Sequence, residues 1–230
     1  MDEAKKTNSI RGEEFINRFL SGRTIDIGCG PDLVTPHAIP FDKEQGDAQS
    51  ILNYFEPASF DCVHSSHCLE HMQNVESALC NWWALVKPGG YLVVVVPDED
   101  LYEQGFWPSI FNIDHKATFN LGKRESWSPV SYDIEALIKA LPGAEILEAR
   151  LQNDGYDRHL LRRSAMSRFL GRWSSRRQRS FDQLSRIGLP TYRINLWSHR
   201  LETVLGKPID QTLGAAVAQI QVVAQKHGSH

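Results

Sequence analysis

Residues 74–97 are NVESALCNWWALVKPGGYLVVVVP, and this stretch decides the fold class. Apolar residues recur at the spacing of one helical face from Val75 to Val86, and Asn74 is a suitable N-cap. The run Lys87-Pro88-Gly89-Gly90 ends the predicted helix. Residues 91–96 are then apolar on both faces, as in the centre of a covered parallel sheet. A helix followed by such a strand predicts an α/β protein.

The rest of the chain extends this alternation in both directions. Three short β-prone runs precede the central helix, at residues 23–28, 38–42 and 60–65, and an amphipathic helix is predicted over 9–20. A helix over 131–141, a strand over 144–151, an Arg-rich helical segment over 155–187 and a strand over 216–226 follow. This order predicts an α/β doubly wound sheet, whose ligands bind at the carboxyl ends of the strands.

Length and composition favour one globular domain, 1–230, with residues 155–213 as a helical insertion within it. The chain has 230 residues, of which 41% are hydrophobic and 23% charged, so it can bury a sizeable core. No apolar run is long enough for a transmembrane helix, and the first residues are polar. The four cysteines form no CxxC pair, so we expect reduced thiols in a cytoplasmic protein.

Charge is distributed unevenly along the chain. Residues 158–200 contain eleven arginines, no lysine and a single acid, Asp182, which gives this window a net charge of +10 and the rest −13. Such a segment can bind an anionic substrate or partner. It can equally be a solvated helical surface that packs on its own acidic domain.

Three candidate binding motifs follow the first two strands. The sequence Ile25-Asp26-Ile27-Gly28-Cys29-Gly30 closes the first strand with two glycines, which allow a tight turn and close approach to a ligand. An ordinary turn is the alternative. Asp42 ends the second strand, where a carboxylate can accept both hydroxyls of a ribose. The pair Asp47-Ala48 can contact an adenine through a carboxylate and a backbone N–H. Solvated loop acids are the alternative for both.

Histidines gather after the third strand, in His64-Ser65-Ser66-His67-Cys68-Leu69-Glu70-His71. The spacing is not HExxH, so we expect no metal here and instead place His64 to His67 on the floor of a pocket. A Mg²⁺ requirement stays open, because oxygen ligands could come from Asp98, Glu99, Asp100 and Asp114.

Taken in order, the motifs IDIGCG, FD, GDA, SFDCVHSSHCLEHM and LVKPGGYLVVVVP resemble those of the class I S-adenosylmethionine-dependent methyltransferases. The resemblance covers about residues 23–97 and the final strand, and it implies a Rossmann-like sheet with a reversed last strand. Asp32 replaces the usual third glycine, and the first two helices of the family have no room. This compact form is similar to methyltransferases of surface-polysaccharide and lipopolysaccharide pathways.

The resemblance implies which residues hold the cofactor S-adenosylmethionine. Those for the methionine part lie in the first loop, those for ribose and adenine follow the second strand, and those beside the sulfonium end the third strand. The full set is Asp26, Gly28, Cys29, Gly30, Asp42, Asp47, Ala48, His64 and Ser65. Substrate residues would come from 97–130 and 155–200.

The acceptor group is predicted to be a hydroxyl of a sugar or glycan, and the Arg-rich segment is compatible with an anionic acceptor molecule. The chain lacks the NPPY or DPPY sequence of amide N-methyltransferases and the Pro-Cys pair of cytosine C5 enzymes. A hydroxyl needs a general base, and histidine is the side chain best suited to neutral pH. We expect His115 to be this base with Asp114 steering it, and His67 to be the alternative. Asp114 and His115 could instead merely cap their loop.

Two alternatives come from the Arg-rich segment. The chain could be a non-catalytic methyltransferase-fold protein that acts as an assembly partner, although the complete cofactor set argues against this. It could also be an RNA methyltransferase, but the segment lacks lysine and any RNA-binding module, so nucleic acid is disfavoured. A homodimer is a further expectation.

Overall fold

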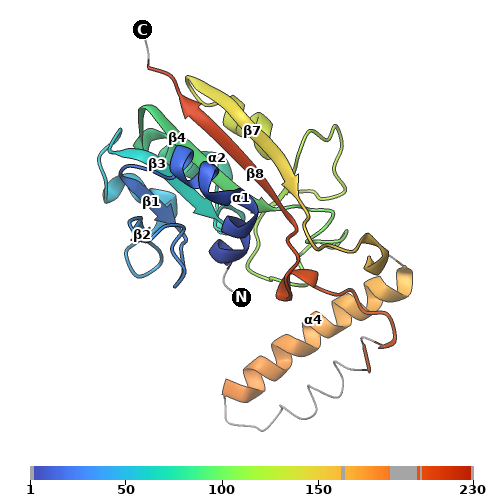
Figure 1. The fold of residues 1–230 in the computed structure, drawn as a ribbon. Helices are drawn as coiled ribbons and strands as arrows, with labels where there is room; N and C mark the ends of the chain where they lie inside the picture. The colour runs from blue at the N-terminus through green and yellow to red at the C-terminus, as the bar shows by residue number, and fades with distance from the viewer. Residues whose placement is uncertain (1–2, 162–163, 187–200, 203, 229–230) are drawn as a thin grey trace.

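A computed structural model describes residues 3–161, 164–186, 201–202 and 204–228, and Figure 1 shows their arrangement. A six-stranded sheet runs in the order β2-β1-β3-β4-β8-β7. Its strands are β1 (Thr24–Ile27), β2 (Ile39–Phe41), β3 (Phe60–Ser66), β4 (Val86–Pro97), β7 (Ala144–Gln152) and β8 (Gln219–Lys226). Two short strands, β5 (Thr118–Asn120) and β6 (Ser131–Asp133), form a separate parallel pair.

The strand directions confirm the predicted Rossmann-like sheet. Strands β2, β1, β3 and β4 are parallel neighbours, while β8 runs antiparallel to both β4 and β7. The reversed last strand therefore lies inside the sheet, between β4 and β7. Because four parallel strands end at one edge, the loops that follow β1, β2, β3 and β4 gather there, and this edge positions the site.

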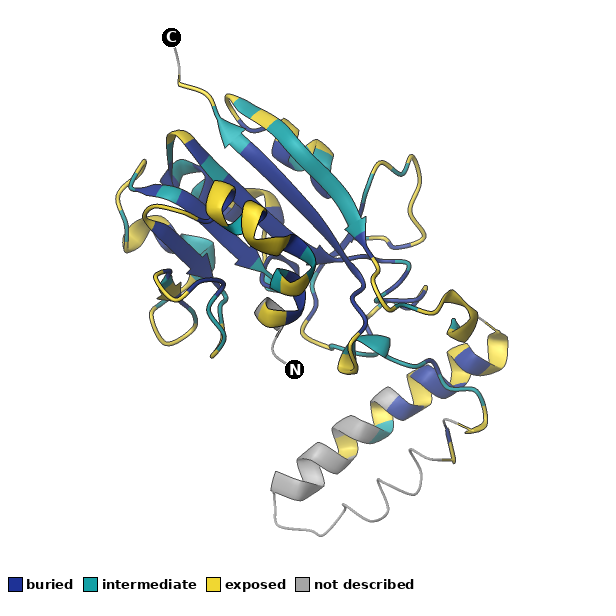
Figure 2. Cartoon of the chain, in the orientation of Figure 1, coloured by how far each residue is buried: buried dark blue, intermediate teal, exposed yellow. Residues whose placement is uncertain are grey.

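Helices cover the sheet on both faces. Helix α1 (Glu3–Phe19) lies on one face, and α2 (Val75–Leu85) and α3 (Ile134–Lys139) lie on the other (Figure 1). Alternate residues of β4 serve the two layers: Val94 packs in the cluster with α2 and α3, and Val93 packs in the cluster with α1. The central strands are buried along nearly their whole length (Figure 2), as the run LVVVV predicts.

The predicted central helix is confirmed, and two others differ from expectation. Helix α2 starts after Asn74, whose Oδ1 accepts a hydrogen bond from Ser77 N at 2.9 Å. Helix α1 begins earlier than expected and is interrupted at Gly12, where φ is 74°. The helix predicted over 131–141 is shorter, because residues 131–133 pair with β5 and Asp133 caps a helix that starts at Ile134.

The segment between β7 and β8 carries the helix α4 (Ala165–Arg186), which projects away from the sheet (Figure 1). Short 3-10 turns flank it: η3 (Arg158–Leu160) and η4 (Gln211–Leu213). Part of the Arg-rich window, residues 162–163 and 187–200, lies outside the described residues. Within the described part of the chain, no helix has the length and apolar character needed to cross a membrane.

Candidate functional site

The larger of two neighbouring pockets lies at the carboxyl ends of β1 and β2. Its volume is about 790 Å³. Four residues that the sequence assigns to the cofactor line it: Gly28, Asp42, Asp47 and Ala48. The other lining residues are Phe41, Lys43, Gly46, His67, Cys68, His71, Met72, Asp114 and Lys116. The sequence motifs thus meet in one cavity, as expected for loops that follow parallel strands.

Gly28 brings the first loop against the loop that follows β3. Its φ of 74° is a conformation that residues with a Cβ rarely adopt, and its N–H donates to Phe41 O at 2.8 Å. A Cβ at this position would lie 2.5 Å from the Cβ of Cys68. Both the turn and the close approach therefore require glycine here.

The carboxylate of Asp42 is fixed by two backbone N–H groups. Its Oδ2 accepts from Gly30 N at 2.7 Å, and its Oδ1 accepts from Lys43 N at 2.6 Å. Each carboxylate oxygen has a second lone pair, so the group can still accept hydroxyls of a ligand. Gly30 thus supports the site through Asp42. Asp47 is also held, because its Oδ1 accepts from Gln49 N at 2.9 Å and caps a short 3-10 turn.

Three predicted cofactor residues instead lie below the pocket. Asp26 is buried, with Oδ1 accepting from His64 Nδ1 at 2.6 Å and Oδ2 accepting from Val34 N at 2.7 Å. His64 and Ser65 are buried in β3 and are not among the described residues that line the pocket. Asp26 and His64 brace the first loop through the Asp26–Val34 and Asp26–His64 hydrogen bonds, and a direct contact of these three residues with the cofactor stays a prediction.

Arg11 is a supporting residue that the sequence analysis missed. Its Nη2 donates to His64 Nε2 at 3.1 Å and its Nε to Gln221 Oε1 at 2.7 Å. Burial lowers the pKa of Arg11 to about 10 and also lowers the pKa of His64, which Asp26 partly opposes. His64 is therefore neutral, with its hydrogen on Nδ1. The sequence holds one clue to this role: Arg11 lies four residues before Phe15 and therefore on the apolar face of the first helix.

The smaller pocket, of about 310 Å³, lies beside the larger one. His67 and His71 line both pockets, so the two cavities meet at these imidazoles. The remaining wall mixes polar and aromatic groups, namely Glu70, Tyr102, Phe111, Asn112, His115, Asp210, Thr212, Leu213, Val217, Ala218 and Gln219. Residues from the loop after β4 and from the segment before β8 therefore complete a cavity next to the predicted cofactor.

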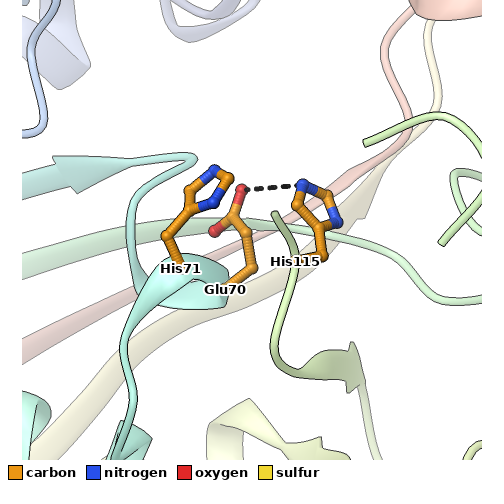
Figure 3. Close-up of side chains that lie close together, drawn as sticks. All are labelled: Glu70, His71 and His115. Carbon is orange, nitrogen blue, oxygen red and sulfur yellow. Dashed lines mark ion pairs between the residues drawn. The ribbon is translucent and has the colours of Figure 1, made fainter. Parts of the chain in front are cut away.

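A buried carboxylate, Glu70, lies at the centre of the histidines. Its Oε1 is 3.5 Å from His67 Nδ1 and 3.9 Å from His115 Nε2. Neither carboxylate oxygen has a hydrogen-bond partner among the described residues. Burial alone would raise the pKa of Glu70, but the neighbouring imidazoles hold it below its usual range. Figure 3 shows Glu70 between His71 and His115.

His115 is positioned by a residue that the sequence analysis did not identify. Its Nδ1 is 2.6 Å from Glu103 Oε1, and its ring stacks on Tyr102 with centroids 5.3 Å apart. The predicted pairing with Asp114 is wrong, because neighbours in a loop point apart: the Asp114 carboxylate lies 3.1 Å from His71 Nδ1. Glu103 lies in an irregular, acidic segment, where no periodicity indicates side-chain direction.

Ligand atoms for a metal converge at one place. One atom each from Glu70, His71 and His115 lie within 4.8 Å of one another. The acids suggested for Mg²⁺ do not cluster in this way. Glu99 and Asp100 pair with Lys123, and Asp98 caps its own turn through Leu101 N. The spacing of the histidines in the sequence does not predict that these three ligand atoms lie so close together.

Comparisons with known proteins identify the family. A family model described as a methyltransferase domain matches residues 7–157. A structure of an S-adenosylmethionine-dependent methyltransferase from Archaeoglobus fulgidus is 15% identical, with a TM-score of 0.50, and the match covers 98% of this chain and 95% of that one. No curated protein matches the chain.

Two further structures are less similar. A phosphoethanolamine N-methyltransferase 2 of Haemonchus contortus is 17% identical over 98% of this chain and 57% of that one, with a TM-score of 0.46. A protein of Galdieria sulphuraria is 12% identical over 86% of this chain, which spans 62% of that one, with a TM-score of 0.43. The family match covers more than half of the chain and agrees with the sheet order. The chain therefore belongs to the methyltransferase domain family and is an S-adenosylmethionine-dependent methyltransferase.

Proposed function

We propose that this methyltransferase transfers the methyl group to a hydroxyl oxygen of a sugar or glycan. The observation that carries the proposal is the meeting of the two pockets at His67 and His71. S-adenosylmethionine occupies the larger pocket, with its ribose on Asp42 and its adenine near Asp47 and Ala48. The acceptor occupies the smaller pocket, so that its oxygen meets the methyl group where the cavities join.

The smaller pocket suits a polyhydroxylated acceptor. Asn112, Asp210 and Thr212 offer amide, carboxylate and hydroxyl groups that hydrogen-bond sugar hydroxyls. Tyr102 and Phe111 supply ring faces for apolar packing. A few polar groups among apolar walls are typical of small-molecule sites. The resemblance to enzymes of surface-polysaccharide and lipopolysaccharide pathways adds to this assignment.

The chemistry needs alignment and the removal of one proton. The acceptor oxygen attacks the methyl carbon of the sulfonium, the carbon–sulfur bond breaks, and a neutral thioether leaves. The hydroxyl proton passes to an imidazole. We assign this proton to His67 rather than to His115, because His67 lines both pockets. Glu70, 3.5 Å from His67 Nδ1, stabilises the imidazolium that forms. His115, fixed by Glu103, and Asp114, beside His71, shape the acceptor side.

Helix α4 supports an anionic acceptor. Arg168, Arg172 and Arg176 line a shallow surface hollow with Phe169 and Trp173. We propose that residues 155–213 act as a helical insertion that attracts an acidic glycan or a similar partner. RNA is the second candidate for this surface, because exposed aromatic rings beside arginines can stack on bases.

Two further expectations accompany this proposal. The four cysteines are unpaired, which supports the cytoplasm as the location. A homodimer also stays a prediction, and light scattering on the purified protein tests it.

The acceptor class is tested by a screen with S-adenosylmethionine labelled at the methyl carbon. Nucleotide sugars and acidic glycans are the first acceptors, with RNA oligonucleotides in a parallel arm. We expect label in a methyl ether of a sugar. Label in RNA, with an affinity that falls steeply with salt, would favour the second candidate. Cofactor binding without turnover on any acceptor would favour a non-catalytic protein.

The base is tested by comparing two alanine variants. His67→Ala should lower kcat by roughly 10²–10⁴-fold, the usual contribution of proton transfer, while the affinity for S-adenosylmethionine changes little. His227→Ala, an exposed histidine that follows β8 and lines neither pocket, is the matched control and should retain full activity. A loss below about threefold in His67→Ala, with activity abolished in His115→Ala, would return the role to His115.

A further inference from the structure

We propose that Glu70, His71 and His115 bind a divalent first-row transition-metal ion beside the junction of the two pockets. The role of the ion rests on the proposed methyl transfer, whereas the arrangement of the three side chains does not depend on it. Figure 3 shows the three side chains, which come from the turn after β3 and from the loop after β4. Their ligand atoms lie within 4.8 Å of one another.

When the imidazoles are neutral, the hydrogen bonds around Glu70, His71 and His115 direct no hydrogen at the Glu70 carboxylate. Glu103 can only accept when ionised, so the hydrogen that it shares with His115 lies on Nδ1, and Nε2 keeps its lone pair. That Nε2 faces the Glu70 carboxylate at 3.9 Å. A lone pair and an anion thus face each other in a buried place. A cation between them removes this conflict.

His67 has the same arrangement on the other side of Glu70. Gln219 donates from Nε2 to Thr7 Oγ1 at 3.0 Å and to Gln152 Oε1 at 2.6 Å, which turns its Oε1 toward His67 Nε2 at 2.9 Å. In the neutral ring, His67 Nε2 then carries the hydrogen, and Nδ1 presents a lone pair to Glu70. When both imidazoles are neutral, acceptors therefore converge on Glu70 from two directions, whereas a protonated ring would donate to it.

Glu70 is also unsatisfied as a buried group. Its side chain is 1% exposed, and neither oxygen has a hydrogen-bond partner in the described part of the chain. Buried carboxylates usually have partners or coordinate metals. The Glu103–His115 pair matches the carboxylate that commonly orients a metal-binding histidine from behind.

Distances and ligand types indicate the class of ion. Bonds of about 2.1 Å place neighbouring ligand atoms roughly 3.0–3.4 Å apart. The present separations reach up to 4.8 Å, so the side chains need to close by up to about 1.4–1.8 Å. Two imidazoles with one carboxylate favour Zn²⁺, Fe²⁺, Co²⁺ or Mn²⁺ over Ca²⁺, which prefers oxygen ligands. Such a set leaves coordination positions open. His71 lines both pockets, so these positions can reach the acceptor hydroxyl.

The ion would act on the hydroxyl before transfer. When the hydroxyl oxygen binds the ion, its O–H bond becomes more acidic. The proton then passes to His67, the oxygen attacks the methyl carbon, and the thioether leaves. No electron transfer is involved. His67 keeps its role as base, since it is not one of the three ligands.

The test is a Co²⁺ titration of the full chain after treatment with a chelator. Visible absorption bands report nitrogen ligation, calorimetry with Zn²⁺ gives the affinity, and elemental analysis gives the stoichiometry. We expect one ion per chain. Glu70→Gln and His115→Ala should weaken binding by at least a hundredfold, and Glu103→Gln by roughly 10–100-fold.

Two variants serve as controls. His67→Ala should keep the ion within about threefold of the wild-type affinity while losing turnover, and His227→Ala, an exposed change after β8, should change neither. Equal affinity of the wild type, Glu70→Gln and His115→Ala for the metal ion would overturn the metal site. Glu70 and the histidines would then be held together by shared protons. Full methyl transfer by protein that binds no ion would overturn it too, with the proposed function intact. A bound ion without any methylated hydroxyl acceptor would support the site and contradict the proposed function.

Discussion

Asp42 shows how one carboxylate can hold a loop and still have lone pairs for a ligand. Its two oxygens already accept from Gly30 N and Lys43 N, which points the carboxylate and holds the glycine loop. Asp42→Ala should weaken S-adenosylmethionine binding by about 1.5–3 kcal/mol per lost charge-assisted hydrogen bond, which calorimetry measures. Asp32→Ala, a change in the neighbouring loop between β1 and β2 but outside the lining of the pocket, is the control. Equal losses in both variants would mean that Asp42 does not contact the ribose.

Residue-level prediction from the sequence succeeds where the backbone sets the position. Gly28 and Asp42 directly follow β1 and β2, and Asp47 and Ala48 lie in the loop after β2, so topology brings the four residues to one pocket. Prediction fails where a contact depends on the direction in which a loop side chain points. Asp114 and His115 are adjacent in an irregular loop but point to different partners, and Glu103 is eleven residues away from Asp114. No periodicity in that loop indicates such a choice.

At the scale of elements, the carboxyl group of Asp98, directly after β4, makes the stability of the fold depend on pH. Asp98 Oδ1 accepts from Leu101 N at 2.9 Å, and burial raises the pKa of Asp98 from 3.8 to about 6. The folded state therefore binds this proton more tightly than the unfolded state. The free energy of unfolding should fall as pH rises from about 4 to about 6, by roughly 3 kcal/mol for this group.

Asp98→Asn removes this titration while keeping an oxygen acceptor for the turn. Urea unfolding at pH 4.5 and at pH 7.5 measures the effect. We expect the variant to gain stability relative to the wild type at the higher pH and to show a smaller difference at the lower pH. The same pH dependence in both proteins would show that Asp98 titrates normally.

Helix α4 divides its surface between packing and exposure. Leu170, Gly171 and Ser174 are buried, and a Cβ on Gly171 would lie 2.9 Å from Ile110 Cδ1. Met166, Phe169 and Trp173 are 62%, 64% and 46% exposed, which is unusual for large apolar side chains on one helix. Arginines flank this exposed stripe. The helix thus packs with one face and exposes the other.

The α4 surface is tested by neutralising Arg168, Arg172 and Arg176 to Gln together. The variant should elute from a heparin column at lower salt than a control with the same charge change elsewhere, Arg18→Gln, Arg124→Gln and Lys139→Gln. All three control positions are exposed. Equal elution of the two variants would show that α4 carries no special affinity for anions.

Elements themselves were predictable wherever the pattern was strong. The central helix follows from spacing and an N-cap, and the buried strand from its apolar run. The helix ends at Leu85, and the run over residues 87–90, predicted to stop it, lies within β4. Strands β1, β2 and β3 were also found within one or two residues. The helix expected over 131–141 was too long, because residues 131–133 pair with β5, a three-residue strand too short to give a sequence pattern.

The whole molecule places two pockets on one edge of one sheet. The loops after parallel β1, β2 and β3 line the larger pocket, while the loop after β4 and the residues before the reversed β8 enclose the smaller one. The sheet order could be expected from the family resemblance. The second pocket could not, because residues as far apart as Tyr102 and Gln219 form it, and a single sequence does not indicate such contacts.

The central claim is that the methyl donor lies in the larger pocket with its sulfur directed to the junction. A crystal structure with S-adenosylhomocysteine tests this most directly. We expect the adenine beside Asp47 and Ala48, the ribose hydroxyls on the Asp42 carboxylate, and the sulfur facing His67 and His71, next to an open acceptor pocket. A ligand bound elsewhere, or bound here with its sulfur directed away from these two histidines, would contradict the account.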